Sequence, residues 1–229
     1  MLFITDKNIP PEAKNKLNHY GEVLEFSTRG ITYPQISNHP DIFFCKVDGT
    51  FFCSPNTPIE FVQLLISKGI PIFKGNGSVG VKYPESALYN AVFTDNYLIH
   101  NFKITDDNLQ KAVGKRKLIN VKQGYTRCSL LPLKDNYFIT SDEGINKKLL
   151  DEGTDVLYVN PHGIILPGEE YGLFGGTAGV DSERIFIIGN LKYFPEGDKV
   201  KKCLENLNYE IIELYDGPLY DGGSIFIMG

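Results

Sequence analysis

The chain has 229 residues, of which 42% are hydrophobic and 22% are charged, which is enough to bury a sizeable core in one globular domain. Its formal net charge of −5 and the lack of a long Lys/Arg run argue against nucleic acid as a partner. The sequence has no run of about 18 apolar residues and its apolar start is too short for a signal peptide, so we expect a cytoplasmic protein without a membrane partner.

A short strand pattern recurs along the chain. Asp-Asn-Tyr-Leu-Ile at 95–99 returns as Asp-Asn-Tyr-Phe-Ile at 135–139, and weaker copies begin near positions 1, 48 and 183. Internal repeats of this length are typical of propellers and solenoids. The pattern therefore predicts one domain over 1–229, built from five modules at approximately 1–47, 48–94, 95–134, 135–182 and 183–229.

Each module is predicted to run strand, helix, strand, loop and third strand. The predicted helices are 11–20, 58–68, 105–113, 144–152 and 195–207. The predicted second strands are 23–26, 70–73, 118–121, 156–159 and 210–214. The predicted third strands are 42–47, 88–93, 129–133, the segment from 178 onward, and 224–228.

Such a module cannot bury both of its faces alone, so the five must pack side by side. Five similar wedges can close into a ring, and neither terminal module has the polar cap that an open solenoid needs. We therefore favour an α/β fold in the form of a closed five-module propeller with pseudo-fivefold symmetry. The alternative is a three-layer sandwich with one continuous sheet, which the alternation of strands and helices also permits.

Five such modules in 229 residues resemble the pentein, or guanidino-group-modifying, superfamily, which includes arginine deiminases, amidinotransferases and dimethylarginine dimethylaminohydrolases. The resemblance implies a catalytic Cys in the last strand, an earlier His that moves protons, and carboxylates that hold the cationic group. At the corresponding places this chain has Phe226 and Ile227 in the last strand, and Gln123 near the position of the catalytic His. An alkane cannot attack carbon and an amide cannot take a proton near neutral pH, so the usual chemistry is absent.

Aligning the modules on their third strands predicts which side chains meet in the middle. Three positions before the strand start lie His39, Glu85 and Arg127, with glycine in the other two modules. A base, a carboxylate and a guanidinium in one hollow are typical of a polar small-molecule site, but a buried ion-pair network would have the same composition. The glycines of the last two modules indicate either close convergence of the chain or a loop that cradles a ligand: Gly175, Gly176, Gly222 and Gly223.

The sequence leaves three functions open. The first is binding of a small cationic or zwitterionic ligand, arginine-like or amine-like, without the usual Cys-His chemistry. Its expected binding residues are Asp41, Glu85, Arg127, Ser129, Asp216 and Asp221. Asp216 and Asp221 would form a cage in the last loop, where ordinary turn chemistry is the alternative.

The second function is a C–N hydrolase or amidinotransferase. Its catalytic residues would be Cys128 as nucleophile, His39 as base and Glu85 as the orienting carboxylate, with Arg127 lowering the pKa of the thiol. The third is a scaffold that binds a ribosome or another protein, as the resemblance implies for one branch of the fold. The cysteines lack Cys-x-x-Cys spacing, so no metal and no cofactor are expected, and a homo-oligomer is among the alternatives for assembly.

Overall fold

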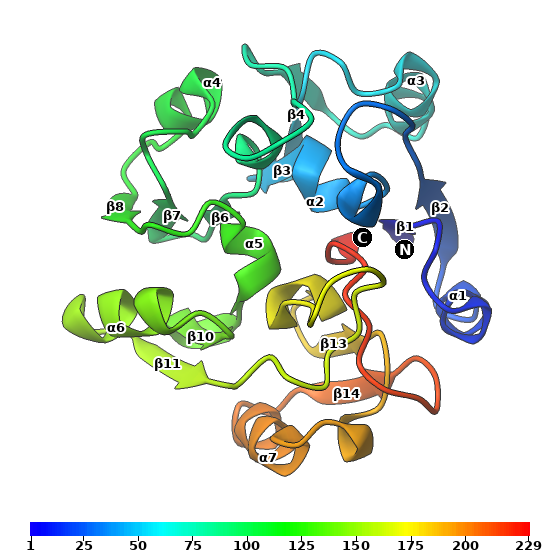
Figure 1. Ribbon diagram of the computed structural model, residues 1–229, viewed down its shortest axis with the longest axis vertical. Helices are drawn as coiled ribbons and strands as arrows, with labels where there is room; N and C mark the ends of the chain where they lie inside the picture. The colour runs from blue at the N-terminus through cyan, green and yellow to red at the C-terminus, as the bar shows by residue number, and fades with distance from the viewer.

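Five three-stranded sheets follow one another in the computed structural model, which describes all residues from 1 to 229 (Figure 1). In each sheet a middle strand pairs in parallel with one neighbour and antiparallel with the other. The middle strands are β1 (Leu2–Asp6), β4 (Thr50–Cys53), β7 (Tyr97–His100), β10 (Tyr137–Thr140) and β13 (Arg184–Ile187). Five separate sheets exclude the alternative of one continuous sheet.

A helix connects each middle strand to its parallel neighbour. These helices are α1 (Pro11–Asn18), α3 (Ile59–Ser67), α4 (Asp107–Lys111), α6 (Glu143–Asp151) and α7 (Gly197–Asn206), and Figure 1 shows them around the outside. The parallel neighbours are β2 (Glu22–Phe26), β5 (Ile72–Lys74), β8 (Lys117–Asn120), β11 (Asp155–Tyr158) and β14 (Glu210–Glu213). The predicted helices and second strands are thus confirmed, with small differences at their ends.

Helix α6 illustrates why these segments are helical. The Asp142 carboxylate caps the helix by accepting a hydrogen bond from the Ile145 amide at 2.7 Å. Ile145 and Leu149, four residues apart on one face, are both buried. The cap and the buried stripe together place the helix against its own sheet.

The antiparallel strands of the five sheets are β3 (Phe44–Val47), β6 (Val92–Phe93), β9 (Leu130–Pro132), β12 (Ala178–Val180) and β15 (Phe226–Met228). Each pairs with the first strand of the following module, and β15 pairs with β1 at the start of the chain. The hydrogen-bonded sheets therefore cross the predicted module boundaries. Figure 1 shows the sheets arranged around the middle of the molecule.

Single helical turns precede four of these strands, where the sequence predicted extended chain in two cases. They are α2 (Pro40–Phe43), η2 (Glu85–Ala87), α5 (Thr126–Ser129) and η4 (Phe174–Thr177); further 3-10 turns are η1 (Pro34–Ile36), η3 (Lys134–Asn136) and η5 (Leu191–Tyr193). The third strands of the first, second and last modules begin at Phe44, Val92 and Phe226, later than predicted. Proline at the first position favours a helical turn in α2, and its buried apolar residues imitate a strand pattern.

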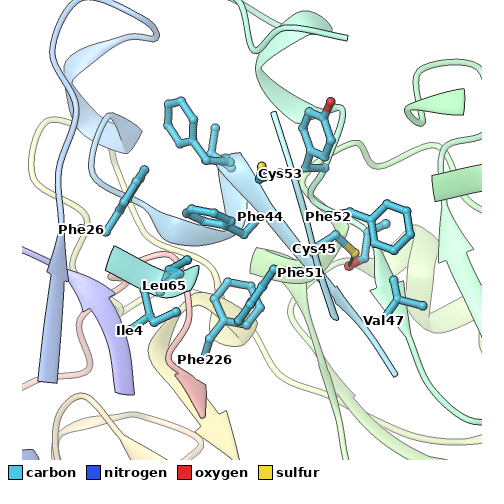
Figure 2. Close-up of a cluster of buried hydrophobic side chains, with 14 of the residues drawn as sticks. Ile4, Phe26, Phe44, Cys45, Val47, Phe51, Phe52, Cys53, Leu65 and Phe226 are labelled. Atoms are coloured by element: carbon cyan, nitrogen blue, oxygen red, sulfur yellow. Dashed lines mark hydrogen bonds between the residues drawn. The ribbon is translucent and has the colours of Figure 1, made fainter. Parts of the chain in front are cut away.

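The largest hydrophobic cluster joins the beginning of the chain to its end. Figure 2 shows Phe226 of β15 beside Phe51 of β4, and their ring centroids lie 5.1 Å apart. Phe44 packs on Phe51 at 5.7 Å and on Phe26 of β2 at 5.3 Å. Edge-to-face aromatic contacts of this kind stabilise the junction between neighbouring sheets.

No helix has the length and apolar character needed to cross a membrane. All four cysteines are free thiols.

Candidate functional site

The segments just before the third strands, which we call the inner turns, bring a group of buried polar side chains together. We call this group the central cluster: His39, Asp41, Asn90, Cys128 and Ser224. Asp41 Oδ2 accepts hydrogen bonds from Ser224 Oγ at 2.7 Å and from Cys128 Sγ at 3.1 Å. The Asn90 amide donates to the Asp41 carbonyl oxygen at 3.0 Å and to Cys128 Sγ at 3.2 Å, and accepts from the Cys128 backbone N–H at 3.1 Å. Segments from four parts of the chain are therefore joined by side chains rather than by a sheet.

His39 lies between two buried carboxylates. Its Nε2 is 3.7 Å from Asp6 Oδ2, and its Nδ1 is 3.9 Å from Asp221 Oδ1. Burial raises the pKa of Asp6 and of Asp221, while the nearby imidazole acts in the opposite direction. Backbone amides of Leu173 and Gly223 also donate to Asp221, at 2.8 and 3.0 Å.

Two glycines allow the chain to approach this close. A Cβ atom on Gly176 would overlap the Asp221 carboxylate, and one on Gly223 would overlap the His39 side chain. Gly223 also has a φ of +63°, a conformation that residues with a Cβ adopt reluctantly. The glycines here serve close packing, which was one of the two expectations.

Burial and the carboxylates of Asp41 and Asp221 raise the pKa of Cys128 well above that of an ordinary thiol. The expectation that Arg127 would make this thiol reactive is not met, because burial and the two carboxylates outweigh the attraction between the guanidinium and the thiolate. Arg127 Nη1 donates to the Gly175 carbonyl oxygen at 2.8 Å and its Nη2 donates to that of Ala178 at 3.2 Å. The surroundings of Cys128 therefore disfavour its thiolate form.

Next to the cluster lies a cavity of about 400 Å³, which we call the central cavity. Residues of β3, β6, β9, β12 and β15 all contribute to its lining, so the five third strands surround one hollow. Phe226 and Ile227, which the resemblance aligns with the family His and Cys, are among them. The lining also holds four cationic side chains: Lys46, Arg116, Arg127 and Lys134.

Three of these cations, Lys46, Arg127 and Lys134, form no ion pair, and Lys134 Nζ instead donates to the Asn208 carbonyl oxygen at 3.2 Å. Lys46 Nζ donates to the Ile227 carbonyl oxygen at 2.7 Å, and neither Lys46 nor Arg127 has a carboxylate within 4 Å. Burial lowers the pKa of both groups. By contrast Arg116 forms an ion pair with Asp48. The cavity lining thus holds cations that form no ion pair, although the carboxylates of Asp41 and Asp221 attract Arg127 at longer range.

Glu85 does not join the central cluster. It is exposed at the start of η2 and makes no side-chain hydrogen bond or ion pair. The reason is that the third strand of the second module starts later than predicted. Val92 pairs with Ile99 of β7, and Leu131 pairs with Ile139, the equivalent residue of β10. Counting back two residues from each, Asn90 and not Ala87 is the counterpart of Ser129. The same correction puts Asp41, rather than His39, in register with Arg127.

The remaining predicted residues are divided between the centre and the surface. Asp41 and Ser129 are buried in the centre, and the Ser129 hydroxyl has no hydrogen-bond partner. Asp221 is buried beside His39, but Asp216 is exposed and paired with Lys192. The predicted cage of the last loop is therefore not formed.

Sequence reasoning missed Asn90 and Lys46. Both are polar residues inside short apolar segments that were interpreted as strands, and that interruption was the available signal. Ser224 was predicted only as the first residue of the last third strand, although its hydroxyl donates a hydrogen bond to the Asp41 carboxylate.

Comparison with solved structures identifies enzymes of the pentein superfamily, with sequence identities that support a likeness of fold alone. An amidinotransferase of saxitoxin biosynthesis from Microseira wollei is 12% identical, with a TM-score of 0.54 over 92% of this chain and 87% of the other. Dimethylarginine dimethylaminohydrolase from Pseudomonas aeruginosa, a mutant in complex with citrulline, is 10% identical, with a TM-score of 0.53 over 97% and 92%.

Inosamine-phosphate amidinotransferase from Streptomyces griseus is 12% identical, with a TM-score of 0.54 over 92% of this chain and 77% of the other. A search of curated protein sequences gave no match. These structures confirm the resemblance to penteins. The model of one sequence family matches residues 4–226, so the chain belongs to that family, a family of unknown function (DUF6873).

Proposed function

We propose that this protein binds a small zwitterionic, amino-acid-like ligand in the central cavity and does so without the Cys-His chemistry of the pentein enzymes. The observation that carries the proposal is the pair of half-buried cations, Lys46 and Arg127, which face the cavity without a carboxylate partner. A buried cation without a counter-ion is unfavourable, and a ligand carboxylate would remove that cost.

Spare hydrogen-bond donors support the same assignment. Lys46 uses one of its three N–H donors on Ile227, and Arg127 uses two of its five on main-chain carbonyl groups. The others can bind carboxylate oxygens. At the rim, the exposed carboxylate of Asp95 has no ion-pair partner and is suited to the ligand's ammonium group.

Apolar residues at the reactive positions support binding rather than catalysis. Phe226 and Ile227, the residues that the resemblance aligns with the family His and Cys, line the cavity. The hydrolase or amidinotransferase alternative needs Cys128 as a thiolate, but this thiol is 3% exposed and donates to Asp41. Its surroundings therefore favour the binding function.

We infer further that the five modules of 1–229 form a closed five-module propeller. Two observations support closure: β15 pairs with β1, and all five third strands line one cavity. In a closed ring, every module would contribute residues to the cavity, and no single module would contain the whole site.

Arginine and agmatine form a matched pair of probes, because agmatine lacks only the α-carboxylate. We expect arginine, or the citrulline that a dimethylarginine dimethylaminohydrolase of this fold binds, to raise the melting temperature of the protein, and agmatine to leave it unchanged. Isothermal titration should then give a dissociation constant for the ligand that stabilises.

The variants Lys46→Gln and Arg127→Gln should each weaken that binding by about tenfold or more, because each removes a charge-assisted hydrogen bond to the ligand carboxylate. Lys192→Gln is the control, since this exposed lysine lies on the surface in an ion pair with Asp216. Glu85→Ala should also bind like the parent. Equal stabilisation by arginine and agmatine, or no stabilisation by any of these ligands, would contradict the proposal.

A further inference from the structure

The central cluster contains an imidazole, a carboxylate and a thiol that lie close together but belong to no recognisable sequence motif. One ligand atom each from His39, Asp41 and Cys128 can be chosen so that all three lie within 4.8 Å of one another. The three side chains are 1%, 0% and 3% exposed. Neighbouring ligands of a tetrahedral metal ion stand about 3.3–3.8 Å apart, given metal–ligand bonds of about 2.0–2.3 Å, so the three side chains would have to close in slightly around an ion.

Two atoms of the trio lack the partners that buried polar atoms normally have. His39 Nδ1 and Asp41 Oδ1 make no hydrogen bond. Most buried polar atoms in folded proteins are satisfied, so an orphaned pair beside a thiol requires an explanation. The opposite ring nitrogen, Nε2 of His39, faces the Asp6 carboxylate at 3.7 Å, an arrangement that orients metal-bound imidazoles in known sites.

The charges around these three residues also favour a bound cation. Asp6, Asp41 and Asp221 are three buried carboxylates, and the nearby cationic groups are Arg127 and, when protonated, His39. A divalent cation would balance this excess of acidic groups.

We propose that His39, Asp41 and Cys128 bind one zinc ion, or a divalent ion of similar softness, as a structural site. Sulfur and imidazole nitrogen favour zinc over magnesium or calcium, which prefer sites made of oxygen alone. When the metal–sulfur bond forms, the thiol proton leaves to solvent and the metal keeps its oxidation state. Ser224 Oγ, which donates to Asp41 Oδ2 at 2.7 Å, would orient this carboxylate toward the ion.

Cysteine spacing argued against a metal because these ligands come from two turns far apart in sequence. His39 precedes α2, Asp41 is inside α2, and Cys128 belongs to α5. The ion would therefore join two modules at the centre, and its uptake would be coupled to folding.

Cobalt provides the test, because a Co²⁺–thiolate bond gives a charge-transfer absorption band that free Co²⁺ lacks. The parent protein, refolded from urea with Co²⁺ and passed over a desalting column, should retain one cobalt per chain by mass spectrometry and show this band. Zn²⁺ should displace the cobalt and abolish the band. A parent protein that retains no cobalt, or retains it without the band, would overturn the proposal.

Two serine variants separate this site from adventitious binding to cysteine. Cys128→Ser should lose the band and the retained metal, whereas Cys45→Ser should keep both, since Cys45 is equally buried but donates to the Ala91 carbonyl oxygen outside the trio. If Cys128→Ser does not refold by circular dichroism, Asp41→Asn replaces it and should lower cobalt retention at least tenfold. A band that survives in Cys128→Ser or is lost in Cys45→Ser would place the metal elsewhere.

Discussion

Replacing Asn90 with alanine should destabilise the protein far more than the loss of one polar side chain usually does. The amide makes three hydrogen bonds, to the Asp41 carbonyl oxygen, to Cys128 Sγ and from the Cys128 N–H, and the residue is fully buried. Alanine would leave the Asp41 carbonyl and the Cys128 N–H without these partners, at a cost of about 1–3 kcal/mol for each group. Adding the small void, we expect a loss of about 3–5 kcal/mol in the free energy of unfolding.

Urea denaturation followed by circular dichroism and by tyrosine fluorescence measures this loss. With a slope of about 2 kcal/mol per molar urea, the midpoint should fall by about 2 M. Asn15→Ala is the control, because Asn15 is exposed in α1 and should change stability by about 0.5 kcal/mol or less. A loss below about 1 kcal/mol in Asn90→Ala, with an unchanged slope, would refute the idea that this amide ties the inner turns together.

Three further predictions concern the same region. Gly223→Ala should lose about 2–4 kcal/mol of unfolding free energy, but Gly49→Ala, also at positive φ with open space around it, only about 1 kcal/mol; equal losses would argue against the contact with His39. Because burial raises the pKa of Asp221 above 3.8, the native state takes up a proton before the unfolded chain does as the pH falls. As the pH falls from 7 to 4, the free energy of unfolding of the parent should therefore increase relative to that of Asp221→Asn. If urea titrations show the same difference in free energy between the two proteins at every pH, the raised pKa is contradicted. Iodoacetamide should leave Cys128 unmodified in the native protein and label it in urea, as mass spectrometry of peptides can tell; fast native labelling with protection by arginine would revive the hydrolase alternative.

The order of helices and strands could be predicted from the sequence, but the residue at which each third strand begins could not. The repeated Asp-Asn-Tyr pattern located β7 and β10, and helices with caps such as Asp142 were predicted with their second strands. These elements rest on contacts between residues close in sequence. The start of the third strands depends on where the antiparallel partner begins, which lies in the next module.

That dependence explains the outcome for Glu85. An error of three residues in the second module brought an exposed carboxylate into the predicted centre and left out Asn90, which is buried there. In the third module the apolar run began at the true strand, so Arg127, Cys128 and Ser129 were placed correctly. Cytoplasmic location and assembly into a homo-oligomer stay predictions.

The two copies of the repeated turn touch each other. Asn96 Nδ2 donates to Asn136 Oδ1 at 2.9 Å, and the ring of Tyr97 lies 6.2 Å from that of Phe138. Equivalent residues thus act as donor in one copy and acceptor in the next, which is the logic of a head-to-tail interface in a cyclic oligomer. The chain behaves here like neighbouring subunits fused covalently, and a pair such as Asn96→Asp with Asn136→Asp, which sets two like charges face to face, would report on how firmly one copy is held against the next.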